Sequence, residues 1–166
     1  MLERRVGKAL GFDAQILRGA GAHFCAGGDI SEYPAFRFAP DSLRAFHEED
    51  VWGALSAMLA CDCPLVAAID GHCMGAGIEI ASCCDIRIAT IVSRYGAPIG
   101  KLGFPMAPRE AALLTHTLGE TCARSMLLEA AVYSATDMLQ RGFLTRTVAE
   151  ARALQTESER TVSAIC

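Results

Sequence analysis

The fold of this chain is decided by the stretch Pro64-Leu-Val-Ala-Ala-Ile-Asp-Gly-His-Cys-Met-Gly-Ala-Gly-Ile-Glu-Ile-Ala-Ser-Cys-Cys-Asp85. Residues 64–69 are all apolar, which predicts a strand in a sheet that is covered on both faces. A glycine-rich turn follows, and we expect a helix to begin there with Glu79 in its first turns. Backbone N–H groups at a helix start are unpaired and favour negative charge. A glutamate that moves a proton beside donors that hold an oxyanion is suited to enolate chemistry.

A second glycine-rich loop precedes this stretch. Residues 14–19, Ala-Gln-Ile-Leu-Arg-Gly, predict a short buried strand, and the small-residue loop Ala20-Gly-Ala-His-Phe-Cys-Ala-Gly-Gly-Asp-Ile30 follows. Gly27 and Gly28 let the backbone approach a ligand closely, and N–H groups of their neighbours can point at it.

At these residues the chain resembles the crotonase family, the enoyl-CoA hydratase/isomerase superfamily. The family's first signature is similar to Phe24-Cys-Ala-Gly-Gly-Asp-Ile30, and its second is similar to residues 69–79 running on to Cys84-Asp85. The resemblance covers roughly residues 14–148 and continues through Tyr95-Gly-Ala-Pro98, Gly103-Phe-Pro105, Ser134-Ala-Thr-Asp137 and Gly142-Phe-Leu-Thr-Arg146. It implies an α/β fold, the crotonase-like spiral of ββα units.

The resemblance also implies a site for an acyl-CoA thioester. The two oxyanion-hole donors fall on the backbone N–H groups of Ala26 and Ala76, and Glu79 falls on a catalytic acid/base. On position alone, Glu79 would suit a role in stabilising the helix start equally well. No cofactor and no metal are expected, because CoA is part of the substrate. The expected substrate-binding residues are Gly27, Gly28, Asp29, Ile30, Gly75 and Ile99.

Ile99 departs from the family pattern. The second glutamate of the hydratases should follow Pro98, where this chain has isoleucine. Hydration of a double bond uses two carboxylates, so the sequence slightly favours isomerisation over hydration. The alternatives are decarboxylation or hydrolysis of an acyl-CoA, or a non-catalytic acyl-CoA-binding homologue. Glu110 is the nearest downstream carboxylate and the candidate replacement for the missing acid.

The pattern of apolar residues along the chain predicts alternating helices and strands. The resemblance implies a crotonase-like core over residues 1–148, and we expect residues 149–166 to begin a C-terminal helical region. Family members are longer, with a further strand–helix unit before this core and a helical region after it, so we expect parts of the protein to lie outside this sequence. The predicted elements are a helix end over 2–10, a helix from 40 to 58, a strand over 85–89, helices over 107–118 and 120–130, a helix that starts at Ser134 with Asp137 in a capping box, and a helix-prone tail from 149.

Composition narrows the class of protein further. The chain has 166 residues, 52% of them hydrophobic, and a formal charge of −4. This predicts one domain with a substantial core and no general attraction to nucleic acid or anionic membranes. No apolar run reaches the roughly 18 residues of a membrane span, and the start has no signal-peptide core, so we expect a cytoplasmic protein. The resemblance implies a homotrimer or hexamer.

Other motifs in the chain carry weaker signals. The eight cysteines include no Cys-x-x-Cys pair, which favours buried thiols over structural zinc. Neither glycine-rich loop fits a dinucleotide fingerprint or a P-loop. His23 and His72 lie beside the loops but match no catalytic position of the family. Asp29 is expected to cap a turn, and Trp52 to pack in the core or in a pocket wall.

Overall fold

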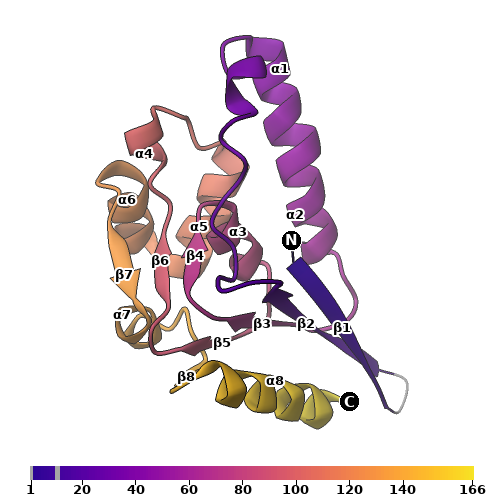
Figure 1. The fold of residues 1–166 in the computed structure, drawn as a ribbon. Coiled ribbons are helices and arrows are strands. Elements are labelled where there is room, and N and C mark those ends of the chain that lie inside the picture. Colours follow the sequence, from indigo (N-terminus) through magenta and orange to yellow (C-terminus); the bar gives the residue numbers. More distant parts are fainter. Residues whose placement is uncertain (1, 10–11) are drawn as a thin grey trace.

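The computed structural model describes residues 2–9 and 12–166, and Figure 1 shows their arrangement. A five-stranded sheet has the order β1-β2-β3-β5-β8, and a three-stranded sheet has the order β4-β6-β7. Strands β2, β3, β5 and β8 run parallel, whereas β1 pairs antiparallel with β2. The strands are β1 (Leu2–Ala9), β2 (Phe12–Gly19), β3 (Leu65–Ile69), β4 (His72–Met74), β5 (Ile86–Thr90), β6 (Arg94–Gly96), β7 (Val132–Ser134) and β8 (Arg146–Val148).

The chain repeats one unit as it winds. Strand β3 lies in the larger sheet, β4 in the smaller one, and helix α3 (Ala76–Ser82) follows. Strands β5 and β6 divide between the two sheets in the same way and are followed by α4 (Ile99–Leu102) and α5 (Pro108–Leu118). These are the ββα units that the sequence predicts.

Strand β3 lies at the centre of the core. All five of its residues are buried. Because side chains alternate along a strand, Val66 and Ala68 pack on one face with Leu154 and Val162 of α8 (Ala151–Ile165). Ala67 and Ile69 face the other way and pack in the cluster that contains Ile78 of α3, among others. The prediction of an apolar strand covered on both faces is confirmed.

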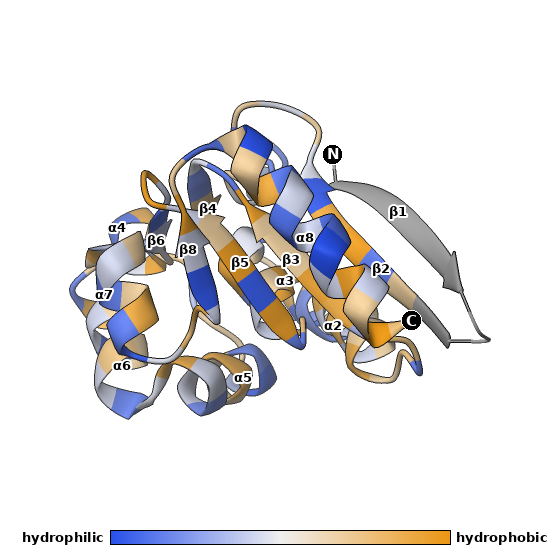
Figure 2. Ribbon diagram, turned by 90° about the horizontal axis from the view of Figure 1, so that it is seen from below, coloured by the Kyte–Doolittle hydropathy of each residue, from blue (hydrophilic) through white to orange (hydrophobic). Residues whose placement is uncertain are grey.

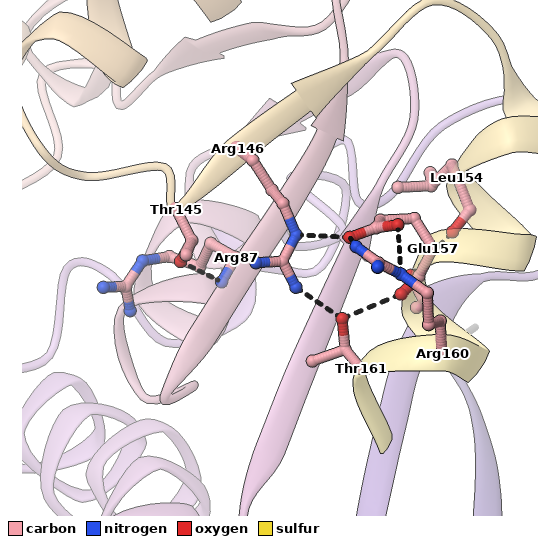
Figure 3. A network of polar contacts seen from close by, with 8 residues as sticks. Arg87, Thr145, Arg146, Leu154, Glu157, Arg160 and Thr161 are labelled. Carbon is pink, nitrogen blue, oxygen red and sulfur yellow. Dashed lines mark hydrogen bonds and ion pairs between the residues drawn. The ribbon is translucent and has the colours of Figure 1, made fainter. Parts of the chain in front are cut away.

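Helix α8 covers one face of the larger sheet, and Figure 2 shows it lying across β2, β3 and β5. A polar network joins helix α8 to β8, which is an edge strand of the larger sheet (Figure 3). Arg146 Nε lies 2.7 Å from an oxygen of Glu157, and the Arg146 guanidinium also donates to the hydroxyl of Thr161. Arg160 forms a second ion pair with Glu157, at 2.8 Å. The helix-prone tail therefore forms a helix, and its role as the start of a longer helical region stays a prediction.

The remaining helices lie close to the predicted ranges. One long helical segment contains α1 (Pro40–Ala45), a π-helical turn η2 (Phe46–Val51) and α2 (Trp52–Leu59). A short helix η1 (Tyr33–Ala35) precedes it, and α6 (Glu120–Leu128) and α7 (Ala135–Gln140) follow α5. The capping box of α7 is confirmed: the Asp137 N–H donates to Ser134 Oγ, and the Ser134 N–H donates to the Asp137 carboxylate.

The prediction of a helix end over residues 2–10 is wrong. Residues 2–9 form β1, which pairs along its whole length with β2, and residue 10 lies outside the described residues. The spacing of Leu2 and Val6 could not distinguish a helix from a strand, because residues four positions apart share a face in both. Pairing with the edge of β2 gives the backbone of β1 its hydrogen-bond partners, which decides for the strand.

Candidate active site

The two glycine-rich loops lie side by side. Cys25 forms an isolated parallel bridge with Cys73 of β4. The Cys25 N–H donates to the carbonyl of His72 at 3.0 Å, and the Met74 N–H donates to the carbonyl of Cys25 at 2.9 Å. These bonds hold the segment after Cys25 against the segment after Met74, and so bring Ala26 and Ala76 to the same part of the molecule.

Glycine at position 77 permits this close approach. A Cβ atom on Gly77 would lie 2.8 Å from Cβ of Cys25 and 2.9 Å from its carbonyl oxygen, too close for any larger residue without movement of the loop. Gly75 has a φ of +53°, a region that L side chains rarely adopt. Its N–H donates to the carbonyl of Gly96 at 2.8 Å, which ties the turn to β6.

The backbone N–H groups of Ala26 and Ala76 are unused donors. Neither of them donates to an acceptor within residues 2–9 and 12–166. Both residues line one cavity of about 460 Å³. Backbone N–H groups without an acceptor favour negative charge, so both are candidate donors to an oxygen of a ligand in this cavity.

All nine site residues predicted from the sequence line this cavity, although they come from several elements. The cavity wall also includes apolar side chains, among them Val51, Met74, Leu102 and Met106, which suit an acyl chain. The nine are Ala26, Gly27, Gly28, Asp29, Ile30, Gly75, Ala76, Glu79 and Ile99.

Glu79 is a buried carboxylate in this cavity. It lies on α3 and is 6% exposed. Burial, together with the negative charge of Glu110, raises the pKa of Glu79 from its ordinary value to about 7. Its carboxylate makes no hydrogen bond to another group of the described chain. A group with this pKa can give and take a proton near neutral pH, and this one is free to do so toward a ligand.

Glu110 is a second buried carboxylate on the same cavity. It lies in the first turn of α5 and is 3% exposed. Its Oε1 lies 2.9 Å from Nδ1 of His47, which lines the cavity as well. Burial raises the pKa of Glu110, and the hydrogen bond with His47 opposes that rise. Among the downstream residues, Glu110 is thus the carboxylate that the fold brings into the cavity.

His47 is a site residue that sequence reasoning missed. It precedes three acidic residues, and this run resembles a solvated face. A signal was nevertheless present, because His47 is four residues after Leu43 and four before Val51. That spacing places it on the apolar face of the predicted helix.

Aromatic rings form part of the cavity lining. The Tyr33 ring stacks on Phe104 with centroids 4.6 Å apart, and Phe36 stacks on Phe46 at 4.3 Å. Tyr33, Phe46 and Phe104 line the cavity. Burial raises the pKa of Tyr33, and the charges of Glu79 and Glu110 add to the effect. These rings lie far apart in the sequence, and no local pattern predicts that they meet.

Other polar residues singled out in the sequence have local roles. The Asp29 carboxylate accepts hydrogen bonds from the N–H of Ser31, at 2.9 Å, and from its hydroxyl, at 2.6 Å, so it caps a turn at the cavity rim. His23 and His72 pack edge to face with centroids 4.4 Å apart, away from the cavity lining.

Trp52 and the cysteines lie outside the cavity lining. The Arg109 guanidinium lies 5.8 Å from the Trp52 ring centroid and forms an ion pair with Glu48 at 3.0 Å. Trp52 is partly buried and packs against a core cluster that includes Leu55, and it is not part of the cavity lining. The eight cysteines are free thiols. In the part of the chain that the structure describes, His, Cys, Asp and Glu side chains form no group of three suited to a metal ion.

Comparison with known proteins places this geometry in a family. The family model described as Enoyl-CoA hydratase/isomerase matches residues 8–164. The chain belongs to the enoyl-CoA hydratase/isomerase family. The crotonase resemblance read from the two signatures is thereby confirmed.

Curated relatives in this family are longer than the chain. It is 31% identical to the mevalonyl-coenzyme A hydratase SIDH of Beauveria bassiana, over 87% of the chain and 54% of that protein. It is 34% identical to the protein named "Probable enoyl-CoA hydratase echA6" of Mycobacterium tuberculosis, over 89% of the chain and 58% of that protein. The chain thus spans somewhat more than half the length of these relatives.

Solved structures of the family have the same fold. An enoyl-CoA hydratase/carnithine racemase from Magnetospirillum magneticum superposes with a TM-score of 0.84 at 34% identity, covering 90% of this chain and 56% of that one. AtuE of Pseudomonas aeruginosa gives a TM-score of 0.82 at 31% identity, covering 90% and 57%. The predicted crotonase-like fold is confirmed. No helix within the described residues has the length and apolar character needed to cross a membrane.

Proposed function

We propose that this chain carries the acyl-CoA site of an enolate-forming enzyme of the hydratase/isomerase type. The observation that carries the proposal is one cavity lined by a buried carboxylate with a pKa of about 7 and by two unused backbone donors. A thioester has the matching chemistry, because its α-proton is acidic only when the carbonyl oxygen is held as it gains charge. Family membership, which includes relatives named as CoA hydratases, supports the same substrate class.

In the proposed reaction, the thioester oxygen accepts hydrogen bonds from the N–H groups of Ala26 and Ala76. Glu79 removes a proton from C2 of a 3-enoyl-CoA, and the electron pair moves into a dienolate whose charge rests on that oxygen. The protonated Glu79 then returns the proton to C4, and the double bond forms between C2 and C3. The atoms balance with one carboxylate and without a metal or redox cofactor.

The residues around these groups would hold the substrate. Gly27, Gly28 and Gly75 keep side chains out of the space beside the donors, and Ile30 and Ile99 add apolar surface. Asp29 fixes the loop through its hydrogen bonds to Ser31.

Isomerisation is the reaction that Glu79 can perform alone, and we keep it slightly ahead of hydration on the ground that Ile99 replaces the second acid. Decarboxylation or hydrolysis of an acyl-CoA would use the same two donors for a different bond. A protein that only binds acyl-CoA would not need a buried glutamate with a raised pKa. The raised pKa of Glu79 therefore argues against a non-catalytic role.

The experiment supplies a 3-enoyl-CoA to the whole gene product in D₂O and identifies the products by mass spectrometry. We expect a 2-enoyl-CoA, with deuterium placed by exchange through Glu79. Glu79→Gln should bind CoA esters and leave them unchanged. Turnover by this variant at the rate of the parent would overturn the proposal.

Assembly and location complete the proposal. Because the family signatures are present, we propose a homotrimer or hexamer that acts in the cytoplasm on acyl-CoA and binds neither nucleic acid nor membranes. Native mass spectrometry of the whole gene product measures the assembly, and a monomer that is fully active would contradict it.

A further inference from the structure

The cavity holds two carboxylates, and the proposed isomerisation uses only one. Glu79 on α3 and Glu110 on α5 are each almost fully buried, and the two helices pack against each other. Both residues line the same cavity, and the negative charge of Glu110 adds to the effect of burial in raising the pKa of Glu79. Burying two acids on one cavity is unfavourable for folding. Such an arrangement is typical of a functional site, where the two acids have a chemical role.

The local surroundings of Glu110 suggest a structural role first. It is the third residue of α5, where a glutamate often reaches back to the N–H of the capping residue, and the Ala107 N–H does interact with it. That role needs neither burial nor a histidine. An exposed glutamate caps a helix equally well, so the contact with His47 and the position in the cavity remain to be explained.

His47 explains how Glu110 is held. Its Nδ1 lies within hydrogen-bond distance of Glu110 Oε1, at 2.9 Å, and this contact orients the carboxylate. The other ring nitrogen, Nε2, is buried and has no hydrogen-bond partner among the residues that the structure describes. A buried ring with one nitrogen on a carboxylate and the other unpartnered is costly as a purely structural pair.

We propose that Glu110 is the second acid/base of the site, that His47 positions it, and that together with Glu79 it allows water to add to a 2-enoyl-CoA. This inference rests on the proposed function and extends it to hydration. It assigns the role that Ile99 cannot fill to a residue on a different helix.

Hydration then needs one proton taken from water and one given to C2. Glu110, as carboxylate, takes a proton from a water molecule while the water oxygen bonds to C3 of the 2-enoyl-CoA. The C2–C3 π electrons move toward the thioester oxygen, which Ala26 and Ala76 hold. Protonated Glu79 gives its proton to C2, and the product is a 3-hydroxyacyl-CoA. Proton exchange with solvent returns both carboxyl groups to their starting states.

The test compares three single variants on two reactions. Glu110→Gln keeps the size of the side chain and a partner for His47. Glu79→Gln removes the acid that both reactions use. Glu48→Gln is the matched control, because Glu48 lies near Glu110 in the fold but is exposed and paired with Arg109. The reactions are hydration of a 2-enoyl-CoA and isomerisation of a 3-enoyl-CoA, with circular dichroism as the check on folding.

We expect Glu110→Gln to lower kcat for hydration by about 10²–10⁴, the usual loss for an acid/base group, and to lower isomerisation by less than about tenfold. Equal hydration by Glu110→Gln and Glu48→Gln would overturn the inference, as would a change confined to KM. Isomerisation without any hydration by the parent protein would overturn the inference alone. A parent protein inactive on both esters would overturn the proposed function and the inference with it.

The positioning role of His47 has its own readout. The charged and titratable groups around Glu110 are His47 and Glu48 of η2, Glu79 of α3 and Tyr33 of η1. Because the hydrogen bond from His47 lowers the pKa of Glu110, His47→Ala should move the acid limb of the hydration profile to higher pH. His47→Asn, which restores an amide donor near Nδ1, should move it part of the way back. An acid limb that is the same in both variants and in the parent would contradict the role.

Discussion

Oε1 of Glu110 lies 2.9 Å from Nδ1 of His47, on a cavity that Glu79 also lines. The three residues come from three different helices, α5, η2 and α3. The hydrogen-bonded pair, His47 and Glu110, is separated by 63 positions in the sequence. The fold therefore gathers two acids at one site although the position after Pro98, where the family signature has an acid, is isoleucine. A site that lacks an acid at the family's usual position can still contain two carboxylates.

The stability of the chain should depend on pH through Glu79. In the folded state the pKa of Glu79 is about 7, against an ordinary value of 4.5, so the unfolded chain loses this proton first as pH rises. The contribution of the buried neutral acid is therefore complete below pH 4.5 and is lost as pH rises through about 7.

Glu79→Gln removes this titration. The variant should match the parent in free energy of unfolding near pH 4.5 and exceed it at pH 8 by about 2–3 kcal/mol, since each pKa unit corresponds to about 1.4 kcal/mol. Urea unfolding at the two pH values measures the difference. Exposed Glu48→Gln should change neither value by more than about 0.5 kcal/mol. A parent and Glu79→Gln variant with parallel pH profiles would contradict the burial of an ionisable acid.

Gly77→Ala should separate the two glycine-rich loops. The new methyl group would meet Cys25 at 2.8 Å, so the loop that carries Ala26 must move. We expect a loss of about 1–3 kcal/mol in stability and a larger relative loss of turnover, because the two donors no longer converge. Differential scanning calorimetry and kcat together measure this.

Gly53→Ala is the matched control for that substitution. Gly53 lies in α2, and an added Cβ there meets nothing within 4 Å. The variant should gain about 0.5–1 kcal/mol from the better helix propensity of alanine and keep its activity. If Gly77→Ala behaved like Gly53→Ala, the close approach of the loops would have no role in the site.

Ile99→Glu should compensate for the loss of Glu110. Ile99 lines the cavity at the start of α4, so a glutamate there would place a carboxylate in the same space. In a Glu110→Gln background, we expect Ile99→Glu to recover hydration by at least about tenfold. Ile99→Gln, with the same shape and no acid, should recover nothing. Equal rates for the two double variants would show that the carboxylate is not what hydration lacks.

Much of this architecture could be predicted from the sequence because its signals are local. The apolar run at residues 64–69 contains the buried strand Leu65–Ile69, and Ser134 with Asp137 forms a capping box within one turn. The signature loops placed Ala26, Ala76 and Glu79 in advance, and all three line one cavity. Local sequence patterns determine local geometry. The two signatures also predict each other's position, because in the family the two loops form one site.

The rest depends on contacts between distant segments. The strand over residues 2–9 is decided by its pairing with β2, and its own apolar spacing fits either structure. His47 and Glu110 meet because the helical segment from 40 to 59 contacts the start of α5. The acidic residues that follow His47 made its position resemble an exposed one in the sequence. The aromatic stacking of Tyr33 on Phe104 has the same origin.

Deuterium exchange at the α-carbon tests the central claim most directly. The whole gene product is incubated in D₂O with a saturated acyl-CoA, which can neither isomerise nor add water. Mass spectrometry then measures how much deuterium the ester has gained. The account predicts that the parent protein, and Glu110→Gln as well, exchange the α-protons, whereas Glu79→Gln does not. Exchange that continues in Glu79→Gln, or that fails in all three proteins, would contradict enolate formation at this site.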